Sequence, residues 1–307
     1  MVSAGRSRPR HRESIADESH FVDLRSERDV FVLMARHEYD EVFQLAGEVG
    51  GLGYIAMQKN DADIMTNSVK INLAVLDAAR RVSLGKILFA SSQCVYPDRF
   101  EIDPFAQERM VSELDLLPQL YRESDASFNT FPFAQEKLFS EQLYSVYAAA
   151  YGLKVRLARP GNTFGPFCEW RGDRAKAPAA ICRKVSQAPY GGVVDLWGDA
   201  QQTRSFTYVD DAIEGMIRLM ASDYSGPVNL SHDEGVTIAE LFECICKVAG
   251  KVIGFKSVDG PIGVRHRTSD NSICKSVLQW QPSTSLYNGL LKTYPWIARQ
   301  VLELVDG

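Results

Sequence analysis

The sequence predicts an α/β protein with an open, mostly parallel sheet, helices on both faces and a smaller mixed α/β lobe. Short apolar stretches alternate with longer amphipathic stretches from residue 20 to about residue 165, which is the rhythm of βαβ units. After residue 165 helical stretches alternate with short strands in a more mixed pattern. This pattern predicts a second lobe over the carboxyl ends of the sheet, where ligands bind in such folds.

The first elements are short strands around one helix. Strands are expected at 20–24 (HFVDL) and 41–47 (EVFQLAG), on either side of a helix at 26–37. Residues 62–84 carry apolar side chains at helical spacing, with many alanines, and predict a long amphipathic helix. The run at 86–92 (KILFASS) is continuously apolar at its start, as is typical of a strand buried in a parallel sheet.

The later elements keep the alternation. Residues 133–152 predict a helix closed by Gly152, because glycine commonly ends helices. A strand is expected at 153–162 (LKVRLARPGN). Four further helices are expected after it, at 176–187, 209–222, 237–250 and 286–304.

Composition narrows the possible partners. The chain has 307 residues, of which 45% are hydrophobic and 24% charged, enough for one large domain or two lobes that share a core. Its net charge of −5 argues against nucleic acid or an anionic membrane as the main partner. No apolar run approaches the roughly 20 residues that span a bilayer. We therefore expect a protein that binds neither nucleic acid nor membrane.

The six cysteines have no metal-binding pattern. Only Cys244 and Cys246 are close in sequence, and this spacing on a helix directs the two thiols apart. Reduced thiols in a cytoplasmic protein are expected. The basic stretch at 1–14 lacks the apolar run of a secretory signal, and although an organelle-targeting peptide is conceivable, we interpret residues 1–19 as a disordered tail.

A glycine-rich stretch at 47–53 (GEVGGLG) follows a predicted strand. Glycines at this spacing let the backbone approach a pyrophosphate when they lie between a first strand and a helix. Here two strands precede the stretch and no clear helix opens from it, so it is weak as a cofactor loop. Residues 1–19 contain no apolar strand and only one glycine, and cannot form such a turn.

The stretch FASSQCVYP (89–97) places Ser91, Ser92 and Cys94 at the carboxyl end of a buried strand. Hydroxyl groups there can donate hydrogen bonds to a substrate oxygen, and a thiol can move a proton. The alternative is purely structural, with serines that cap the strand end and a small buried cysteine. Without other observations the structural interpretation is favoured.

Cationic residues gather in three loops of the second lobe. In a chain of negative net charge they indicate a small polyanionic ligand, and a diphosphate suits the bidentate geometry of arginine. The alternative is a set of solvated surface charges, which the surrounding glycine, proline and aromatic residues disfavour. The residues are Arg171, Arg174, Lys176, Arg183 and Lys184, then Arg204, and finally Arg265 and Arg267.

Together these motifs resemble the extended short-chain dehydrogenase/reductase family of NAD-dependent epimerases and dehydratases, which have a Rossmann-like, doubly wound sheet. Within it they are most similar to the branch that epimerises GDP-mannose at C3 and C5. The resemblance extends from residue 20 almost to the C-terminus. It is carried by VDLR (22–25), GGLGYI (50–55), FASSQCVYP, RPGNTFGPF (159–167), RGDRAKAPAAICRK (171–184), WGDAQQTRSFTYVDD (197–211) and GVRHRTSDN (263–271).

The resemblance implies a three-part reaction on a nucleotide sugar: NAD oxidises C4 of a GDP-hexose, protons exchange at C3 and C5, and the hydride returns. It implies that Cys94 and Lys176 are the epimerising acid/base pair, that Ser92 lies beside the C4 oxygen, and that Lys137 and Phe133 take the positions of the catalytic lysine and tyrosine. The NAD-binding positions are Lys137, Asp23, Leu45, Ala46 and Ser91, and the substrate-binding positions are Gly51, Gly53, Asn162, Lys184, Arg204 and Arg267.

Two departures from the family pattern affect the redox half. Phe133 cannot accept a proton, and general acid–base catalysis is typically worth about 10²–10⁴-fold. The match also begins near the family's third strand, so the sheet is truncated at its N-terminus and a central strand is left with an open edge. The implied organisation is an incomplete dinucleotide-binding domain over 20–165 and a substrate-binding lobe over 166–307, some segments of which return to the sheet.

Three hypotheses follow. The first is an NAD-dependent sugar-nucleotide epimerase of low rate, in which Tyr96 or a water molecule replaces the missing hydroxyl. The second is an NAD-independent epimerase of a 4-keto sugar nucleotide, and the third is a non-catalytic paralogue that binds nucleotide sugar or a related subunit. The resemblance also implies a homodimer through the helices at 62–84 and 133–152.

Overall fold

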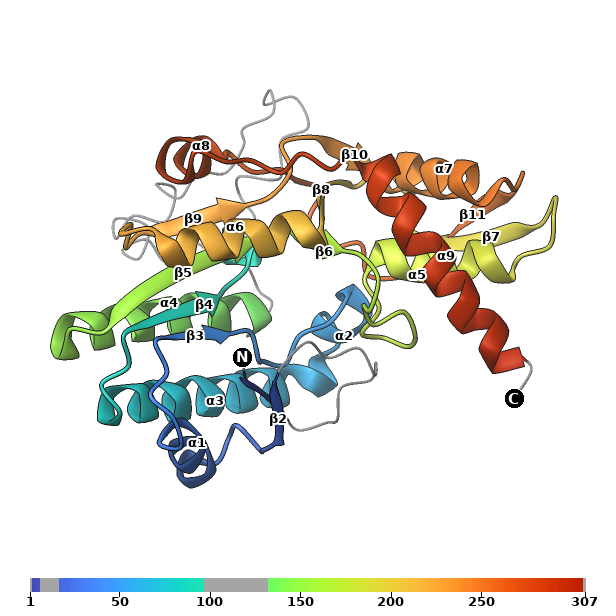
Figure 1. The fold of residues 1–307 in the computed structure, drawn as a ribbon. Helices are drawn as coiled ribbons and strands as arrows, with labels where there is room; N and C mark the ends of the chain where they lie inside the picture. Colours follow the sequence, from blue (N-terminus) through green and yellow to red (C-terminus); the bar gives the residue numbers. More distant parts are fainter. Residues whose placement is uncertain (1, 6–16, 97–131, 306–307) are drawn as a thin grey trace.

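The computed structural model describes residues 2–5, 17–96 and 132–305, and its centre is a parallel sheet of four strands (Figure 1). The strand order is β3-β4-β5-β9, and every neighbouring pair is parallel. The predicted α/β class is therefore confirmed. The strands are β3 (Glu41–Gln44), β4 (Lys86–Ala90), β5 (Lys154–Pro160) and β9 (Pro227–Leu230).

Strand β4 is buried on both faces, as its apolar sequence predicts. Ile87 and Phe89 pack with α1, α3 and α4 on one side, whereas Leu88 packs with α6 and α8 on the other. Successive side chains of a strand point to opposite faces, so only an unbroken apolar run fits between two layers of helices. The helices are α1 (Glu27–Met34), α3 (Asp61–Arg81), α4 (Pro132–Tyr151), α6 (Val209–Ala221) and α8 (Ser272–Leu278).

Strand β3 forms one border of this sheet within the described part of the chain. The strand expected at 20–24 is instead β2 (Glu18–Phe21), which pairs in parallel with β1 (Val2–Gly5) in a separate two-stranded sheet. Strand β1 lies inside the segment expected to be a disordered tail, and that expectation is wrong for Val2–Gly5; residues 1 and 6–16 of the tail lie outside the described residues.

The second lobe is built from short strands and three helices. Strands β10, β8 and β12 form one sheet, with β6 paired to β8, and β7 pairs with β11 in another. The strands are β6 (Asn162–Phe164), β7 (Val193–Trp197), β8 (Thr203–Tyr208), β10 (Gly235–Thr237), β11 (Gly254–Val258) and β12 (His266–Arg267).

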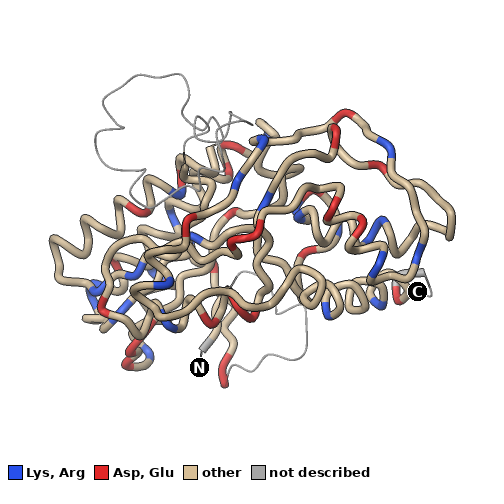
Figure 2. The backbone as a smooth tube through the Cα atoms, turned by 90° about the horizontal axis from the view of Figure 1, so that it is seen from above, with Lys and Arg blue, Asp and Glu red and all other residues tan. Residues whose placement is uncertain are grey.

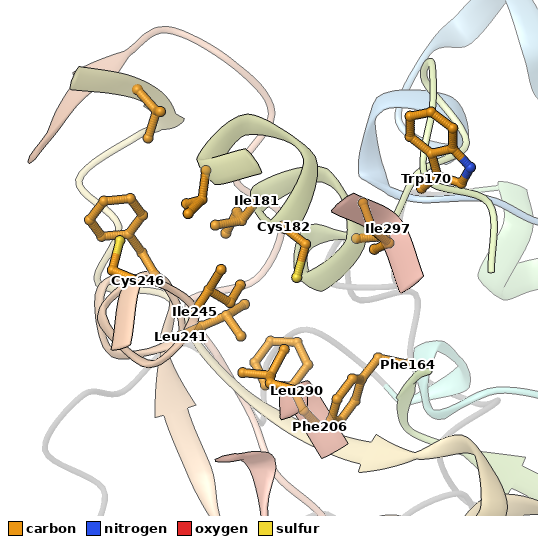
Figure 3. Packing of buried hydrophobic residues seen from close by; sticks show 14 of the residues in the cluster. Phe164, Trp170, Ile181, Cys182, Phe206, Leu241, Ile245, Cys246, Leu290 and Ile297 are labelled. Atoms are coloured by element: carbon orange, nitrogen blue, oxygen red, sulfur yellow. The ribbon is translucent and has the colours of Figure 1, made fainter. Parts of the chain in front are cut away.

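Three helices enclose the core of this lobe: α5 (Ala177–Gln187), α7 (Ile238–Ala249) and α9 (Leu286–Val305). Figure 3 shows Ile181 and Cys182 of α5 facing Leu241 and Ile245 of α7, with Leu290 of α9 beside them. These side chains are almost fully excluded from solvent. The packing fixes the position of α5, whose first turn carries residues of the cavity described below.

The helices expected from the sequence lie within a few residues of the observed ones. Three short elements were not expected: α2 (Leu52–Ile55) and the 3₁₀ helices η1 (Gln58–Asn60) and η2 (Gln93–Val95). Helix α8 was not expected either. Each has seven residues or fewer, too few for a helical period to be visible in the sequence.

Charge is spread along the whole chain. Acidic and basic residues alternate over both lobes in Figure 2, without a continuous basic band. Among the helices of the described ranges, none combines the length and the apolar character that crossing a membrane requires.

Candidate active site

A cavity of about 530 Å³ lies between the carboxyl ends of β4 and β5 and the second lobe. This size is in the range of small-molecule sites. Twelve of the fifteen residues that the sequence assigned to a site line it: Leu45, Gly51, Ser91, Ser92, Cys94, Phe133, Lys137, Asn162, Lys176, Lys184, Arg204 and Arg267. The other three, Asp23, Ala46 and Gly53, do not line it.

The end of β4 brings Ser91, Ser92 and Cys94 to the cavity. The Ser92 hydroxyl oxygen accepts a hydrogen bond from the Cys94 N–H at 3.1 Å and so caps the short helix η2, as the structural interpretation expects. Ser91 is buried and donates to the Glu141 carboxylate at 2.5 Å. Cys94 remains partly exposed in the cavity wall. Of the three, Ser92 and Cys94 are therefore the better placed to meet a ligand.

Cys94, Lys176 and Arg267 meet in the cavity although they come from three distant parts of the chain. Nη1 of Arg267 donates a hydrogen bond to Sγ of Cys94 at 3.2 Å. Lys176 stands at the N-cap of α5, where burial lowers the pKa of its amine while the charge of Cys94 opposes that shift. A lowered pKa increases the fraction of the amine that is neutral at a given pH, and only the neutral amine can accept a proton.

The glycine-rich stretch 47–53 packs against the loop that carries Lys176. The Gly51 N–H donates to the Arg174 carbonyl oxygen at 2.8 Å. A Cβ atom added to Gly51 would lie 2.1 Å from the carbonyl oxygen of Ala175, so a side chain would push this loop away. The glycine at position 51 is thus explained by packing against the chain's own backbone.

Arg174 strengthens the same contact between distant segments. Its guanidinium lies 3.8 Å from the centre of the Tyr54 ring and donates to the Glu48 carboxylate at 2.7 Å. Burial would raise the pKa of Glu48, but the hydrogen bond and charge of Arg174 outweigh it, so the pKa is lowered. Arg174 therefore joins the two segments, and it is not among the residues that line the cavity.

Lys137 and Phe133 lie one helical turn apart on α4. The Lys137 amine donates to the Ala90 carbonyl oxygen at 3.1 Å and lies 4.8 Å from the centre of the Phe89 ring and 5.9 Å from that of Phe133. Burial lowers the pKa of Lys137. The Phe133 ring lines the cavity and presents only carbon and hydrogen to it.

Tyr96 does not replace the missing hydroxyl in this geometry. Its side chain is fully buried, and its hydroxyl donates to Asn229 at 2.8 Å and accepts from Arg159 at 3.1 Å. Arg159 in turn donates to the Glu141 carboxylate at 2.6 Å. Tyr96 belongs to this buried network and is not among the residues that line the cavity.

The grouped cations divide into two sets. Arg171 is exposed and stacks on Trp170, and Arg265 is paired with Asp199 at 2.7 Å, so these two behave as the surface alternative expected. Lys184 and Arg204 line the cavity while their side chains donate to backbone carbonyl oxygens of the second lobe. Of these grouped cations, the ones that line the cavity are Lys176, Arg183, Lys184, Arg204 and Arg267.

The comparisons with known proteins agree with this geometry. The NAD dependent epimerase/dehydratase family matches residues 2–231. The chain belongs to this family. It is 37% identical to the GDP-mannose 3,5-epimerase of Arabidopsis thaliana over 289 residues, which are 94% of this chain and 72% of that protein. It is 38% identical to GDP-mannose 3,5-epimerase 1 of Oryza sativa subsp. indica over 284 residues, 92% of this chain and 71% of that protein.

Solved structures of the epimerase family share the fold. The UDP-glucose 4-epimerase of Thermotoga maritima superposes with a TM-score of 0.83, covering 98% of this chain and 91% of that one at 19% sequence identity. The UDP-glucose 4-epimerase of Thermus thermophilus, solved in complex with NAD, superposes with a TM-score of 0.78 at 20% identity and covers 96% of this chain and 90% of that one. At these identities the likeness concerns the fold.

The described residues form only part of the dinucleotide site that the epimerase family implies. Of the residues assigned to the cofactor, Leu45, Ser91 and Lys137 line the cavity. Asp23, assigned to the cofactor, is instead held by the Arg25 guanidinium at 2.5 and 2.9 Å. The N–H of Ala46 donates to the Gln44 side chain at 2.9 Å.

The glycines of 47–53 do not provide the missing diphosphate cradle. A Cβ atom at Gly50 would lie 2.9 Å from Tyr54, and one at Gly53 would lie 3.1 Å from Trp197. These glycines therefore make room for neighbouring side chains and backbone. Within the described residues the fit to NAD is incomplete.

Sequence reasoning missed several residues that line the cavity. Gln93 and Gln202 are buried, and the Nε2 atom of Gln93 and the Oε1 atom of Gln202 have no hydrogen-bond partner within the described structure. Thr163 and Trp197 also line it. Gln93 stands between Ser92 and Cys94 in the strand-end motif, which is the signal that identifies it in retrospect.

Proposed function

We propose that the chain is an epimerase of a GDP-linked hexose that exchanges protons at C3 and C5, and that its own redox step at C4 is impaired. The single observation that carries this proposal is the arrangement of one cavity. Cys94, Arg267 and Lys176 meet on its wall, and Phe133 occupies the position where oxidation needs a hydroxyl. The relatives that are GDP-mannose 3,5-epimerases support the choice of a GDP-hexose.

The roles proposed for the side chains are those that the family resemblance implies. Cys94 and Lys176 act as the acid/base pair on opposite faces of the sugar ring, and Ser92 donates a hydrogen bond to the oxygen on C4. Arg204, Arg267 and Lys184 bring positive charge to the cavity, where a diphosphate binds through charge-assisted hydrogen bonds. Gly51 and Asn162 border the same space.

The substitution Phe133→Tyr tests the impairment. With GDP-mannose and NAD in D₂O, we expect the wild-type protein to form deuterated epimer slowly and Phe133→Tyr to form it about 10²–10⁴-fold faster, because the tyrosine restores a proton acceptor. Product and deuterium content are measured by chromatography with mass spectrometry. Phe133→Leu is the matched control and should resemble the wild type.

Equal rates for Phe133→Tyr and the wild type would show that residue 133 is not the cause of the impairment. If GDP-mannose binds by calorimetry but neither protein incorporates deuterium from any GDP-hexose, the chain is a binding paralogue instead.

Assembly and location are part of the same proposal. The family resemblance favours a homodimer through α3 and α4, and the exposed apolar residues Phe139 and Val146 on α4 support it. All six cysteines are free thiols, which supports a cytoplasmic location because disulfides are rare there.

A further inference from the structure

We propose that the natural substrate reaches this chain with a keto group already present at C4. The chain would then act after an enzyme that oxidises C4 of a nucleotide sugar and before one that reduces it. This inference rests on the proposed function for the nucleotide sugar and for the roles of Cys94 and Lys176. To that proposed function it adds the oxidation state of C4 in the substrate.

The reaction itself requires a carbonyl group. A base removes a proton from a ring carbon only when the electron pair left behind can be delocalised into an adjacent C=O. The C4 position of an ordinary hexose ring is an alcohol, so C3 and C5 lack that neighbour. Either the site oxidises C4 or the sugar arrives oxidised.

The described residues of the cavity wall are unsuited to oxidising C4. Phe133 accepts no proton, and the hydroxyl of Tyr96 is buried with Asn229 and Arg159. Lys137 uses its amine to donate to the Ala90 carbonyl. A C4 hydroxyl against the Phe133 ring would also lose the acceptor for its own proton, and an unsatisfied buried donor costs about 1–3 kcal/mol.

One carboxylate does line the cavity within the described residues, but it comes from the second lobe and not from α4, which carries Phe133. Asp173 lies in the loop before α5, three residues from Lys176, and is exposed. The fit to NAD is incomplete as well within the described residues, since the Asp23 carboxylate is held by Arg25. Within the described residues, C4 oxidation therefore lacks both a suitably placed base and a complete NAD site.

A keto oxygen at C4 suits the hydrogen-bonding groups of the same cavity wall. A ketone only accepts hydrogen bonds, so an apolar neighbour such as Phe133 leaves none of its groups unsatisfied. Ser92 has a hydroxyl proton to donate, and the buried Nε2 of Gln93 is a donor without a partner in the described structure. The residues that carry these two donors line the same cavity as Phe133, whose ring needs no hydrogen-bond partner.

The proton-transfer half is complete in comparison. One of Cys94 and Lys176 removes the proton on C3 or C5, the C–H electron pair forms a C=C bond, and the C=O pair moves to the oxygen held by Ser92. The other group returns a proton from the opposite face, and the carbonyl re-forms. No electrons are gained or lost, so the reaction needs no cofactor.

The probe is a GDP-linked 4-keto-6-deoxyhexose in D₂O without NAD. We expect deuterium at C3 or C5 at a rate about 10²–10⁴-fold above the spontaneous exchange, measured by NMR and mass spectrometry. Added NAD should not change the rate, and GDP-mannose without NAD should take up none. Cys94→Ala and Lys176→Ala should each lose the enhancement, whereas the surface control Lys256→Ala and the half-buried control Cys244→Ala should retain it.

The outcomes separate the two proposals. If the 4-keto probe exchanges only at the spontaneous rate while GDP-mannose with NAD gives epimer, the keto-substrate inference is overturned and the proposed function stands. If exchange of the probe requires NAD, or is unchanged in both Cys94→Ala and Lys176→Ala, the inference is also overturned. If neither sugar exchanges, both proposals fail.

Discussion

Lys176 lies at the start of α5 in the cavity wall, where desolvation of its amine lowers the pKa below the usual 10.5 of a lysine. Only the neutral amine accepts a proton from carbon. We therefore expect the rate of deuterium exchange to rise with pH through the pKa of Lys176, with the midpoint of the rise below pH 10.5.

The measurement is the pH profile of exchange with the 4-keto probe. Lys176→Arg keeps the charge but cannot give a neutral base in this range, so its profile should lose the rising limb. A rising limb that persists unchanged in Lys176→Arg would assign the titration to another group.

Single residues also mark the limit of what the sequence predicts. Ser92 and Cys94 were predictable as cavity residues because the carboxyl ends of parallel strands gather at one edge. The hydrogen bonds of the Tyr96 hydroxyl were not predictable, because its partners Arg159 and Asn229 are far away in the sequence. Hydrogen bonds between distant segments leave no local pattern.

At the scale of elements, the contact between the 47–53 stretch and the loop before α5 positions Lys176. We expect Gly51→Ala to displace that loop, because its Cβ would lie 2.1 Å from the Ala175 carbonyl oxygen. Overpacking of this kind typically costs about 1–3 kcal/mol of unfolding free energy. Urea unfolding and the exchange assay should show a loss of stability together with a loss of activity.

Gly254→Ala in β11 is the matched control. Its Cβ would have its nearest neighbour at 3.7 Å, an ordinary contact, so stability and exchange should change little. If Gly51→Ala behaves like Gly254→Ala in both assays, the close approach at Gly51 does not position Lys176.

Some helices and strands could be predicted from local sequence patterns, and others could not. Helix α3 was predictable from its long amphipathic period, α4 from the glycine that closes it, and β4 because its apolar run suits burial on both faces. The pairing of β1 with β2 was not predictable, because VSAG has neither an apolar alternation nor a turn signal. Strand partners are chosen by tertiary contacts.

At the scale of the whole molecule, α3 and α4 expose apolar side chains on the face away from the sheet. Phe139 is 48% exposed and Val146 is 59% exposed. We expect the protein to be a dimer in solution and the double substitution Phe139→Asp with Val146→Asp to make it monomeric, because charges at the centre of an interface are costly to desolvate.

Light scattering after size exclusion measures the mass of each form. Ile213→Asp on α6, at a residue that is 50% exposed, is the control and should leave the dimer intact. A monomeric wild type, or a dimer that survives the double substitution, contradicts the proposed interface.

The cavity is bounded by the sheet ends, by α4 and α5, and by the loop that precedes β12, so neither lobe forms it alone. Any ligand that fits it binds only the folded chain and shifts the folding equilibrium by mass action. At a ligand concentration 100 times the Kd the gain is about 2.7 kcal/mol. The two lobes are thereby coupled in thermal unfolding, and a nucleotide sugar that occupies the cavity raises the melting temperature of the molecule as a whole.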